Sequence, residues 1–208
     1  MKKNNIILIG FMGVGKGTVA RAMVKEVEMV GLASHFQMGG KEEVCGNGTL
    51  VPYKNKAGTE VPVPNEGNKE AGMVGINSHF QYVIDTDDLI ESMENRAIKK
   101  IFAVEGEAYF RNLEKKTALW LEESVENTII STGGGFYRQE NLKNIGTVIY
   151  LKSSFDGILK RIKKAPNAKN KLKKRPLLQN KKEAMKLYDT RVKEYERVAD
   201  IIVDVENR

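Results

Sequence analysis

The segment that most constrains the fold runs from an apolar strand directly into a glycine-rich turn. Residues 6–9 are all apolar and are followed by glycine, which predicts a buried strand. The letters GFMGVGKGT follow from Gly10 to Thr18, and beyond them Val19, Met23 and Val27 lie four residues apart, which is typical of a helix. A strand, a glycine-rich turn and a helix in this order are the context that the phosphate-binding pattern G-x-x-x-x-G-K-[ST] requires.

One position departs from that pattern. Gly17 stands where Ser or Thr would contact Mg²⁺, and the hydroxyl comes one place later, on Thr18. Backbone N–H groups at the start of the helix would still cradle phosphate, and Lys16 would neutralise its oxygens. The alternative is a glycine turn that only joins a strand to a helix. The context favours a nucleotide site made of Gly13, Val14, Gly15, Lys16, Gly17 and Thr18.

Four further apolar segments predict strands that alternate with helices, at residues 82–84, 128–131, 147–151 and 200–205. The intervening helices are expected at residues 106–124, 154–163 and 181–199. This alternation predicts an α/β fold, a P-loop three-layer sandwich in which helices cover both faces of a five-stranded parallel sheet. In such sheets ligands bind beyond the carboxyl ends of the strands, so the residues that follow the first three strands should converge on one cleft.

Two of those strands end in residues that carry chemistry or permit close approach. Asp85 is placed to hold Mg²⁺, directly or through water, and Asp87 to face a substrate hydroxyl. The alternative is that Asp87 or Asp88 only caps the next helix and Asp85 is a loop residue. The letters STGGG from Ser131 to Gly135 put bare backbone beside the cleft, either for a ligand or for a tight turn.

The basic residues are concentrated in one segment. Residues 160–182 hold eleven Lys or Arg and no Asp or Glu, more than the net charge of +7. Nucleic-acid binding, a solvated face and a mobile cover over phosphates would all explain this run. No aromatic residue accompanies it, which disfavours stacking on single strands. A cationic lid over residues 164–180, containing Arg175, suits a neighbouring P-loop.

Length and composition favour a single domain, 1–208, interrupted by an insert. Residues 31–77 hold nine of the 19 glycines and three of the five prolines and lack helical spacing. This insert is either a tolerated surface excursion or a dimer or regulatory surface. One cysteine, no apolar run near the roughly 20 residues of a membrane span and no secretory signal favour the cytoplasm. His35, Cys45 and His79 lack zinc-ligand spacing.

Taken together, six segments resemble the shikimate kinases, members of the nucleoside-monophosphate-kinase-like P-loop group. They are GFMGVGKGT, IDTDDLIE, IFAVEGEAYFRNLE, ISTGGG, KRPLL and RVKEYERVAD, in this order, and the resemblance spans residues 4–28 and 80–204. It implies an ATP-dependent kinase with Mg²⁺ that phosphorylates the 3-hydroxyl of shikimate. The implied partners are these small molecules alone, without nucleic acid or membrane, and the implied assembly is a monomer or weak homodimer.

The resemblance also implies roles for particular residues. Lys16, Asp87 and Arg175 would be catalytic, with Asp87 as base and Arg175 as the lid arginine on the γ-phosphate. Arg175 would therefore also contact the nucleotide, and Asp85 would fix Mg²⁺ through water. The substrate would be bound by Asp87, Arg111, Gly133, Gly134, Gly135 and Arg191, with the arginines at its carboxylate.

One departure from the family and two alternative functions remain to be weighed. Gly17 departs from the family, although its GKGT form resembles that of active adenylate kinases, and we expect a water oriented by Asp85 to replace the missing hydroxyl. The protein could still be another small-molecule kinase of this fold, such as a gluconate kinase. It could also be a non-catalytic nucleotide-binding protein in which Gly17 is the lesion. The paired arginines with DTD and TGGG favour shikimate.

Overall fold

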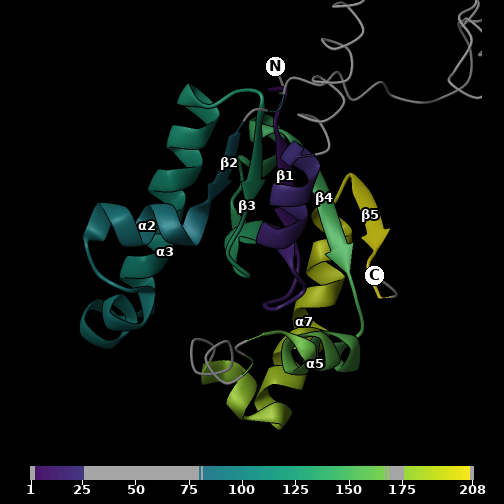
Figure 1. Cartoon of the computed structure of the whole chain (residues 1–208). Coiled ribbons are helices and arrows are strands. Elements are labelled where there is room, and N and C mark those ends of the chain that lie inside the picture. Colours follow the sequence, from purple (N-terminus) through teal and green to yellow (C-terminus); the bar gives the residue numbers. More distant parts are fainter. Residues whose placement is uncertain (1–2, 26–79, 81, 167, 169–175, 207–208) are drawn as a thin grey trace, which may run out of the picture. The chain divides into compact units, whose positions relative to one another are not determined.

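The computed structural model describes residues 3–25, 80, 82–166, 168 and 176–206 (Figure 1). All of them belong to one unit, Met1–Glu28 with His79–Arg208. Residues 29–78 are assigned to a second unit, which lies outside the described residues. The predicted insert 31–77, with His35 and Cys45, and the neighbouring His79 therefore remain undescribed.

Five parallel strands form one sheet in the order β2-β3-β1-β4-β5, which confirms the predicted topology class. β1 lies at the centre, and Ile7 pairs with Ile130 on one side and Val148 on the other. The strands lie close to their predicted positions: β1 Ile6–Ile9, β2 Tyr82–Asp85, β3 Thr128–Ser131, β4 Thr147–Lys152 and β5 Ile201–Asp204.

Helices cover both faces of the sheet. The connection from β1 to β2 runs along the sheet in the opposite direction to the later connections, so right-handed crossovers place its helix on the opposite face. Figure 1 shows this, with the helical residues 16–25 in front of the sheet and α7 behind it. The other elements are α2 Thr86–Glu94, α3 Ile98–Ser124, η1 Phe136–Arg138, α4 Leu142–Ile145, α5 Phe155–Lys164, η2 Pro176–Gln179 and α7 Lys181–Val198.

The core is densest around the central strands. All four residues of β1 and of β3 are buried, as expected for strands covered on both faces. The edge strands differ from that expectation, because Tyr82 on β2 and Ile201 and Ile202 on β5 are exposed. None of the described helices combines the length and apolar composition needed to cross a bilayer.

The predicted helix at residues 106–124 begins at a break inside α3. Gly106 has φ 82° and ψ 178°, a backbone conformation that glycine adopts easily, and α3 is therefore two helical segments joined at this residue. In the sequence Phe110, Leu113, Thr117 and Trp120 lie three or four residues apart, which predicts that they share one side of this helix. Phe110, Leu113 and Thr117 are buried, but Trp120 is exposed and Leu121 packs into the core instead.

Candidate functional site

A cleft of about 620 Å³ lies at the carboxyl ends of the central strands. The P-loop, the end of β2 and the segment after β3 all contribute to its wall, so the three segments that the topology predicted to converge do so. Its lining includes residues 12–19, Arg21, Asp85, Asp87, Ser131, Thr132, Gly134 and Arg161.

The P-loop has the backbone that a phosphate cradle needs. Gly13 and Gly15 have φ values of 87° and 101°, in the left-handed region that favours glycine. A Cβ on Gly13 would also lie 2.6 Å from Ile162 Cδ1. Lys16 is buried beneath the loop and donates through Nζ to the carbonyl oxygen of Gly10 at 2.8 Å. The loop therefore brings one ammonium group to a row of backbone N–H groups at a helix N-terminus.

Position 17 has room for a side chain. A Cβ built on Gly17 would lie 3.5 Å from Arg21 Nη1, 3.6 Å from Asp85 Oδ2 and 3.7 Å from Ser131 Oγ, which are ordinary contact distances. The two oxygens are hydrogen-bonded to each other, and Ser131 Oγ donates to Asp85 Oδ2 at 2.8 Å. These hard oxygen donors beside the phosphate cradle fit Mg²⁺.

The described residues contain no group of three or more His, Cys, Asp or Glu that could hold a metal by itself. Asp85 and its hydroxyl neighbour would therefore supply only part of a coordination shell. Mg²⁺ commonly takes one or two protein oxygens and completes its shell with substrate phosphates and water. The donor set thus fits a metal that arrives with a nucleotide.

The alternative in which Asp87 or Asp88 caps the helix after β2 is wrong. Asp85, not Asp87, is the N-cap of α2, and its Oδ1 accepts from the backbone N–H of Asp87 at 3.0 Å. The reason is that the strand passes into the helix without a loop, so the last strand residue already has the extended backbone, φ −100° and ψ 121°, that a cap requires. Asp87 therefore lies in the first turn, facing Gly133.

The environment of Asp87 changes its acidity. Burial, together with the negative charge of Asp85, raises the pKa of the Asp87 carboxyl from its usual 3.8 to about 6, although Lys16 acts in the opposite direction. A carboxylate of this kind is more basic than an ordinary aspartate. Asp87 can thus accept a hydrogen bond or a proton near neutral pH.

Gly133 to Gly135, here called the glycine ribbon, brings the predicted substrate residues together. A Cβ on Gly133 would collide with Asp87 Oδ1, a Cβ on Gly134 would lie 3.0 Å from Arg191 Nη1, and a Cβ on Gly135 would lie 2.5 Å from Arg111 Nη1. Each glycine therefore packs against a different one of the three charged side chains. The ribbon is the surface on which they meet.

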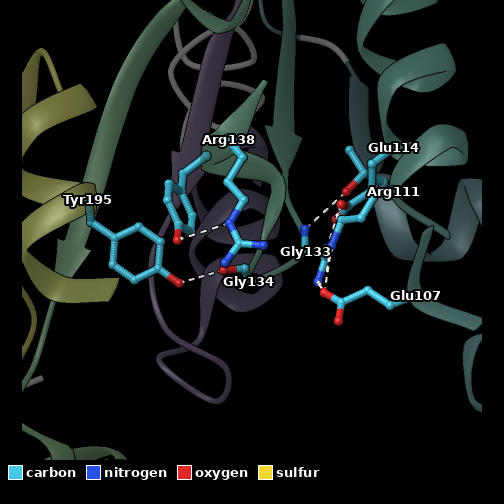
Figure 2. A network of polar contacts seen from close by, with 9 residues as sticks. Glu107, Arg111, Glu114, Gly133, Gly134, Arg138 and Tyr195 are labelled. Atoms are coloured by element: carbon cyan, nitrogen blue, oxygen red, sulfur yellow. Dashed lines mark hydrogen bonds and ion pairs between the residues drawn. The ribbon is translucent and has the colours of Figure 1, made fainter. Parts of the chain in front are cut away.

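Two hydrogen bonds fix the ribbon in place. Gly133 N donates to Thr86 Oγ1 at 3.0 Å, and Tyr195 Oη donates to Gly134 O at 2.7 Å (Figure 2). The first contact comes from α2 and the second from α7. The ribbon is therefore held from both sides by the helices that carry Asp87 and Arg191.

The two arginines differ in how they are held. Arg111 donates to Glu114, at 2.5 Å, and to Glu107, at 2.9 and 3.1 Å (Figure 2). Glu114 is fully buried, and burial raises its pKa, whereas Glu107 is exposed. Arg191 is buried, and its Nε has no hydrogen-bond partner among the described residues. A buried donor without a hydrogen-bond partner costs free energy, so the Arg191 guanidinium is a candidate to bind an anionic ligand.

Several residues of this site were missed by reasoning from the sequence. Arg161 lines the cleft and donates to the carbonyl oxygens of Val14 and Val205, but in the sequence it is only one of the eleven basic residues between positions 160 and 182. Thr86 and Tyr195 lie inside the quoted segments IDTDDLIE and RVKEYERVAD, but neither was given a role in the site. Arg175 and the other residues of the predicted lid at positions 167 and 169–174 lie outside the described residues.

The chain is similar in sequence to known kinases. The family model described as shikimate kinase matches residues 77–208. The shikimate kinase of Helicobacter hepaticus is 28% identical over 200 residues, which cover 96% of this chain and 86% of that protein. The shikimate kinase of Clostridium botulinum strain Okra is 40% identical over 126 residues, which cover 58% of this chain and 71% of that protein.

Solved structures agree with the sequence comparison. Shikimate kinase from Acinetobacter baumannii in complex with shikimate superposes with a TM-score of 0.61 at 25% identity, covering 97% of this chain and 83% of that one. Shikimate kinase from Aquifex aeolicus gives a TM-score of 0.58 at 27% identity, covering 98% and 88%. Because the family model spans well over half of the sequence, this chain belongs to the shikimate kinase family.

Proposed function

We propose that this protein transfers the γ-phosphoryl group of ATP to the 3-hydroxyl of shikimate. The observation that carries the proposal is the glycine ribbon, which packs against one carboxylate and two guanidinium groups beside the P-loop cleft. Shikimate offers one carboxylate and several hydroxyls, and this site offers groups of complementary chemistry. Family membership and the relative from A. baumannii that binds shikimate support the choice.

The donor side of the site is the P-loop. Residues 13–18 would bind the phosphates of ATP through backbone N–H groups, and Lys16 would neutralise the β- and γ-phosphates. Mg²⁺, when bound, would supply further charge neutralisation between these oxygens. Asp85 is suitably placed to orient that metal through water. We expect Arg175 to act from the lid on the charge of the γ-phosphate.

The acceptor side is formed by the residues around the ribbon. Arg191 would direct its buried guanidinium to the shikimate carboxylate. Arg111 is oriented by buried Glu114, and a substrate carboxylate would displace exposed Glu107 from it. Asp87 would accept the hydrogen bond of the attacking 3-hydroxyl and then its proton. Phosphoryl transfer depends on such positioning and charge stabilisation more than on covalent catalysis.

The sequence holds a single cysteine, which suits a reducing compartment, and the proposed site draws all its residues from one chain. We therefore expect a cytoplasmic enzyme that is a monomer or a weak homodimer. A coupled assay of ADP release, with shikimate, gluconate and nucleoside monophosphates as separate acceptors, tests the proposal. Of these acceptors, only shikimate is expected to be phosphorylated. Turnover only with gluconate would make the protein another small-molecule kinase, and ADP binding without any turnover would indicate a non-catalytic protein.

Gly135→Ala is expected to weaken shikimate binding on the order of 10²-fold while leaving ADP binding unchanged. The added methyl group would lie 2.5 Å from Arg111 Nη1 and would push the guanidinium out of position. Losing a desolvated, charge-assisted contact costs roughly 2–5 kcal/mol, and a misplaced guanidinium would forfeit a large part of this. Calorimetry with each ligand provides the measurement. If Gly135→Ala and the wild-type protein bound shikimate equally well, Arg111 would not be part of the acceptor site.

Arg175→Ala is expected to lower kcat on the order of 10²-fold and to change the KM for shikimate much less. The reason is that a lid cation acts mainly on charge that develops as the phosphoryl group moves. Lys182→Ala, at an exposed position on α7 in the same basic stretch, is the matched control and should behave as wild type. A change in shikimate KM alone would make Arg175 a substrate-side residue.

A further inference from the structure

We infer that Ser131, at the end of β3, supplies to the nucleotide-bound Mg²⁺ the hydroxyl oxygen that position 17 lacks. The inference rests on the proposed nucleotide site, but not on the identity of the acceptor. It replaces the water predicted from the sequence with a side chain of this protein. Ser131 lies far from Gly17 along the chain, so the sequence pattern alone does not connect them.

The Ser131 hydroxyl lies close to the place that a side chain at position 17 would occupy. Ser131 Oγ lies 3.7 Å from the point where a Cβ on Gly17 would be, and Asp85 Oδ2 lies 3.6 Å from the same point. A serine at position 17 would extend its own oxygen only a single bond length beyond that Cβ. Its hydroxyl and that of Ser131 would therefore compete for one small region of the cleft. With glycine at position 17, no side chain of that residue competes with the Ser131 oxygen for this region, which Arg21 Nη1 also borders at 3.5 Å from the same point.

The Ser131 hydroxyl is oriented by its hydrogen bond to Asp85. Ser131 Oγ donates its single hydrogen to Asp85 Oδ2 at 2.8 Å. A hydroxyl oxygen keeps two acceptor lone pairs, which must then point away from that carboxylate. Asp85 is itself fixed, because its other oxygen accepts from the backbone N–H of Asp87. The hydroxyl thus has a defined direction at the wall of the cleft, where Ser131 is buried, and its oxygen is a hard donor of the kind that Mg²⁺ prefers.

The hydroxyls next to Ser131 make different hydrogen bonds. Thr128, at the other end of β3, donates to the carbonyl oxygen of Glu126, and Thr132 donates to that of Leu8. Both contacts satisfy backbone groups. Among these three hydroxyls only Ser131 is bonded to a carboxylate, and both partners of that bond line the cleft. Ser131 is therefore distinguished from its neighbours by its contact with a candidate metal ligand.

Calorimetry of ADP binding across a series of Mg²⁺ concentrations tests this inference. Ser131→Ala should bind metal-free ADP as wild type does, but should need about tenfold more Mg²⁺ for the same gain in affinity, the scale found for residues that support a metal site. Ser131→Thr, which keeps the hydroxyl, should stay near wild type. Thr128→Val, which removes a buried hydroxyl from the same strand, should match wild type.

Restoring a hydroxyl at position 17 gives a second, independent test. Ser131→Ala combined with Gly17→Ser should recover the wild-type Mg²⁺ requirement, because the new hydroxyl reaches the same region. An unchanged Mg²⁺ requirement in Ser131→Ala would overturn the inference in favour of water, and lost affinity for metal-free ADP would make Ser131 merely structural. Since ADP is the only ligand, failure of shikimate turnover would leave these results valid.

Discussion

Asp87→Asn is expected to remove nearly all turnover, by about 10²- to 10⁴-fold, while making the ligand-free protein more stable at neutral pH. The loss follows because the amide cannot accept the proton of the attacking hydroxyl. Stability rises because burial and the neighbouring charge of Asp85 both disfavour the ionised Asp87 carboxylate in the wild-type protein. One substitution should therefore move activity and stability in opposite directions.

The sign of the stability effect depends on pH. The pKa of Asp87 is raised in the folded protein from 3.8 to about 6, so folding favours the protonated carboxyl. The wild-type protein therefore loses stability as pH rises from about 4 through 6, and above that pH the loss is complete. At 1.36 kcal/mol per pKa unit the limit is about 3 kcal/mol. The amide of the variant never ionises, so its advantage should appear above pH 6 and vanish below pH 4.

Thermal unfolding of the ligand-free proteins between pH 4 and 8, without Mg²⁺, would measure this difference. Asp189→Asn, at an exposed position on α7, is the control and should leave both stability and turnover unchanged. If Asp87→Asn were less stable than wild type at pH 7.5, Asp87 would be a structural residue. If it kept most of its turnover, Asp87 would not be the base.

Arg191→Met is expected to weaken shikimate binding by about 30- to several-thousand-fold and to leave ADP binding unchanged. Arg191 is buried, and its Nε lacks a partner among the described residues, so a substrate carboxylate would be its main compensating contact. Losing a desolvated, charge-assisted contact costs roughly 2–5 kcal/mol. Methionine keeps much of the side-chain volume, so the packing against Gly134 should survive.

Calorimetry with shikimate and with ADP separates this effect from a general loss of structure. Arg197→Met is the matched control, because Arg197 lies on the same helix but is exposed and pairs with Glu194 at the surface. Its shikimate affinity should equal that of wild type. Equal affinity in Arg191→Met as well would contradict the assignment of the carboxylate site. Arg111 is a less direct test, since its removal would also leave Glu114 buried without its ion pair.

The sheet could be predicted because its strands are recognisable from local sequence. Residues 6–9 and 128–131 are short, largely apolar and followed by glycine or a small polar residue, and the rule that ligands bind at strand ends then placed Asp85 and the ribbon in one cleft. The edges were harder to judge. Tyr82 and Ile202 look like core residues in the sequence, and only the strand order shows that they lie at the margins.

The details of the site depended on contacts between distant residues. Whether Asp85 or Asp87 caps α2 is decided by where the strand ends, a boundary that sequence locates only within a residue or two. The bond from Ser131 to Asp85 and the reach of Arg161 to Val14 join separate segments. No spacing pattern encodes such contacts, because each depends on the positions of two elements at once.

The glycine ribbon has a consequence for inhibitors and resistance. Any side chain at Gly133, Gly134 or Gly135 would run into Asp87, Arg191 or Arg111, the groups proposed to bind the substrate. A compound that takes its affinity from the backbone of these three residues would therefore leave the enzyme few escape mutations. Each substitution that excluded the compound would also disturb the residues proposed to bind shikimate.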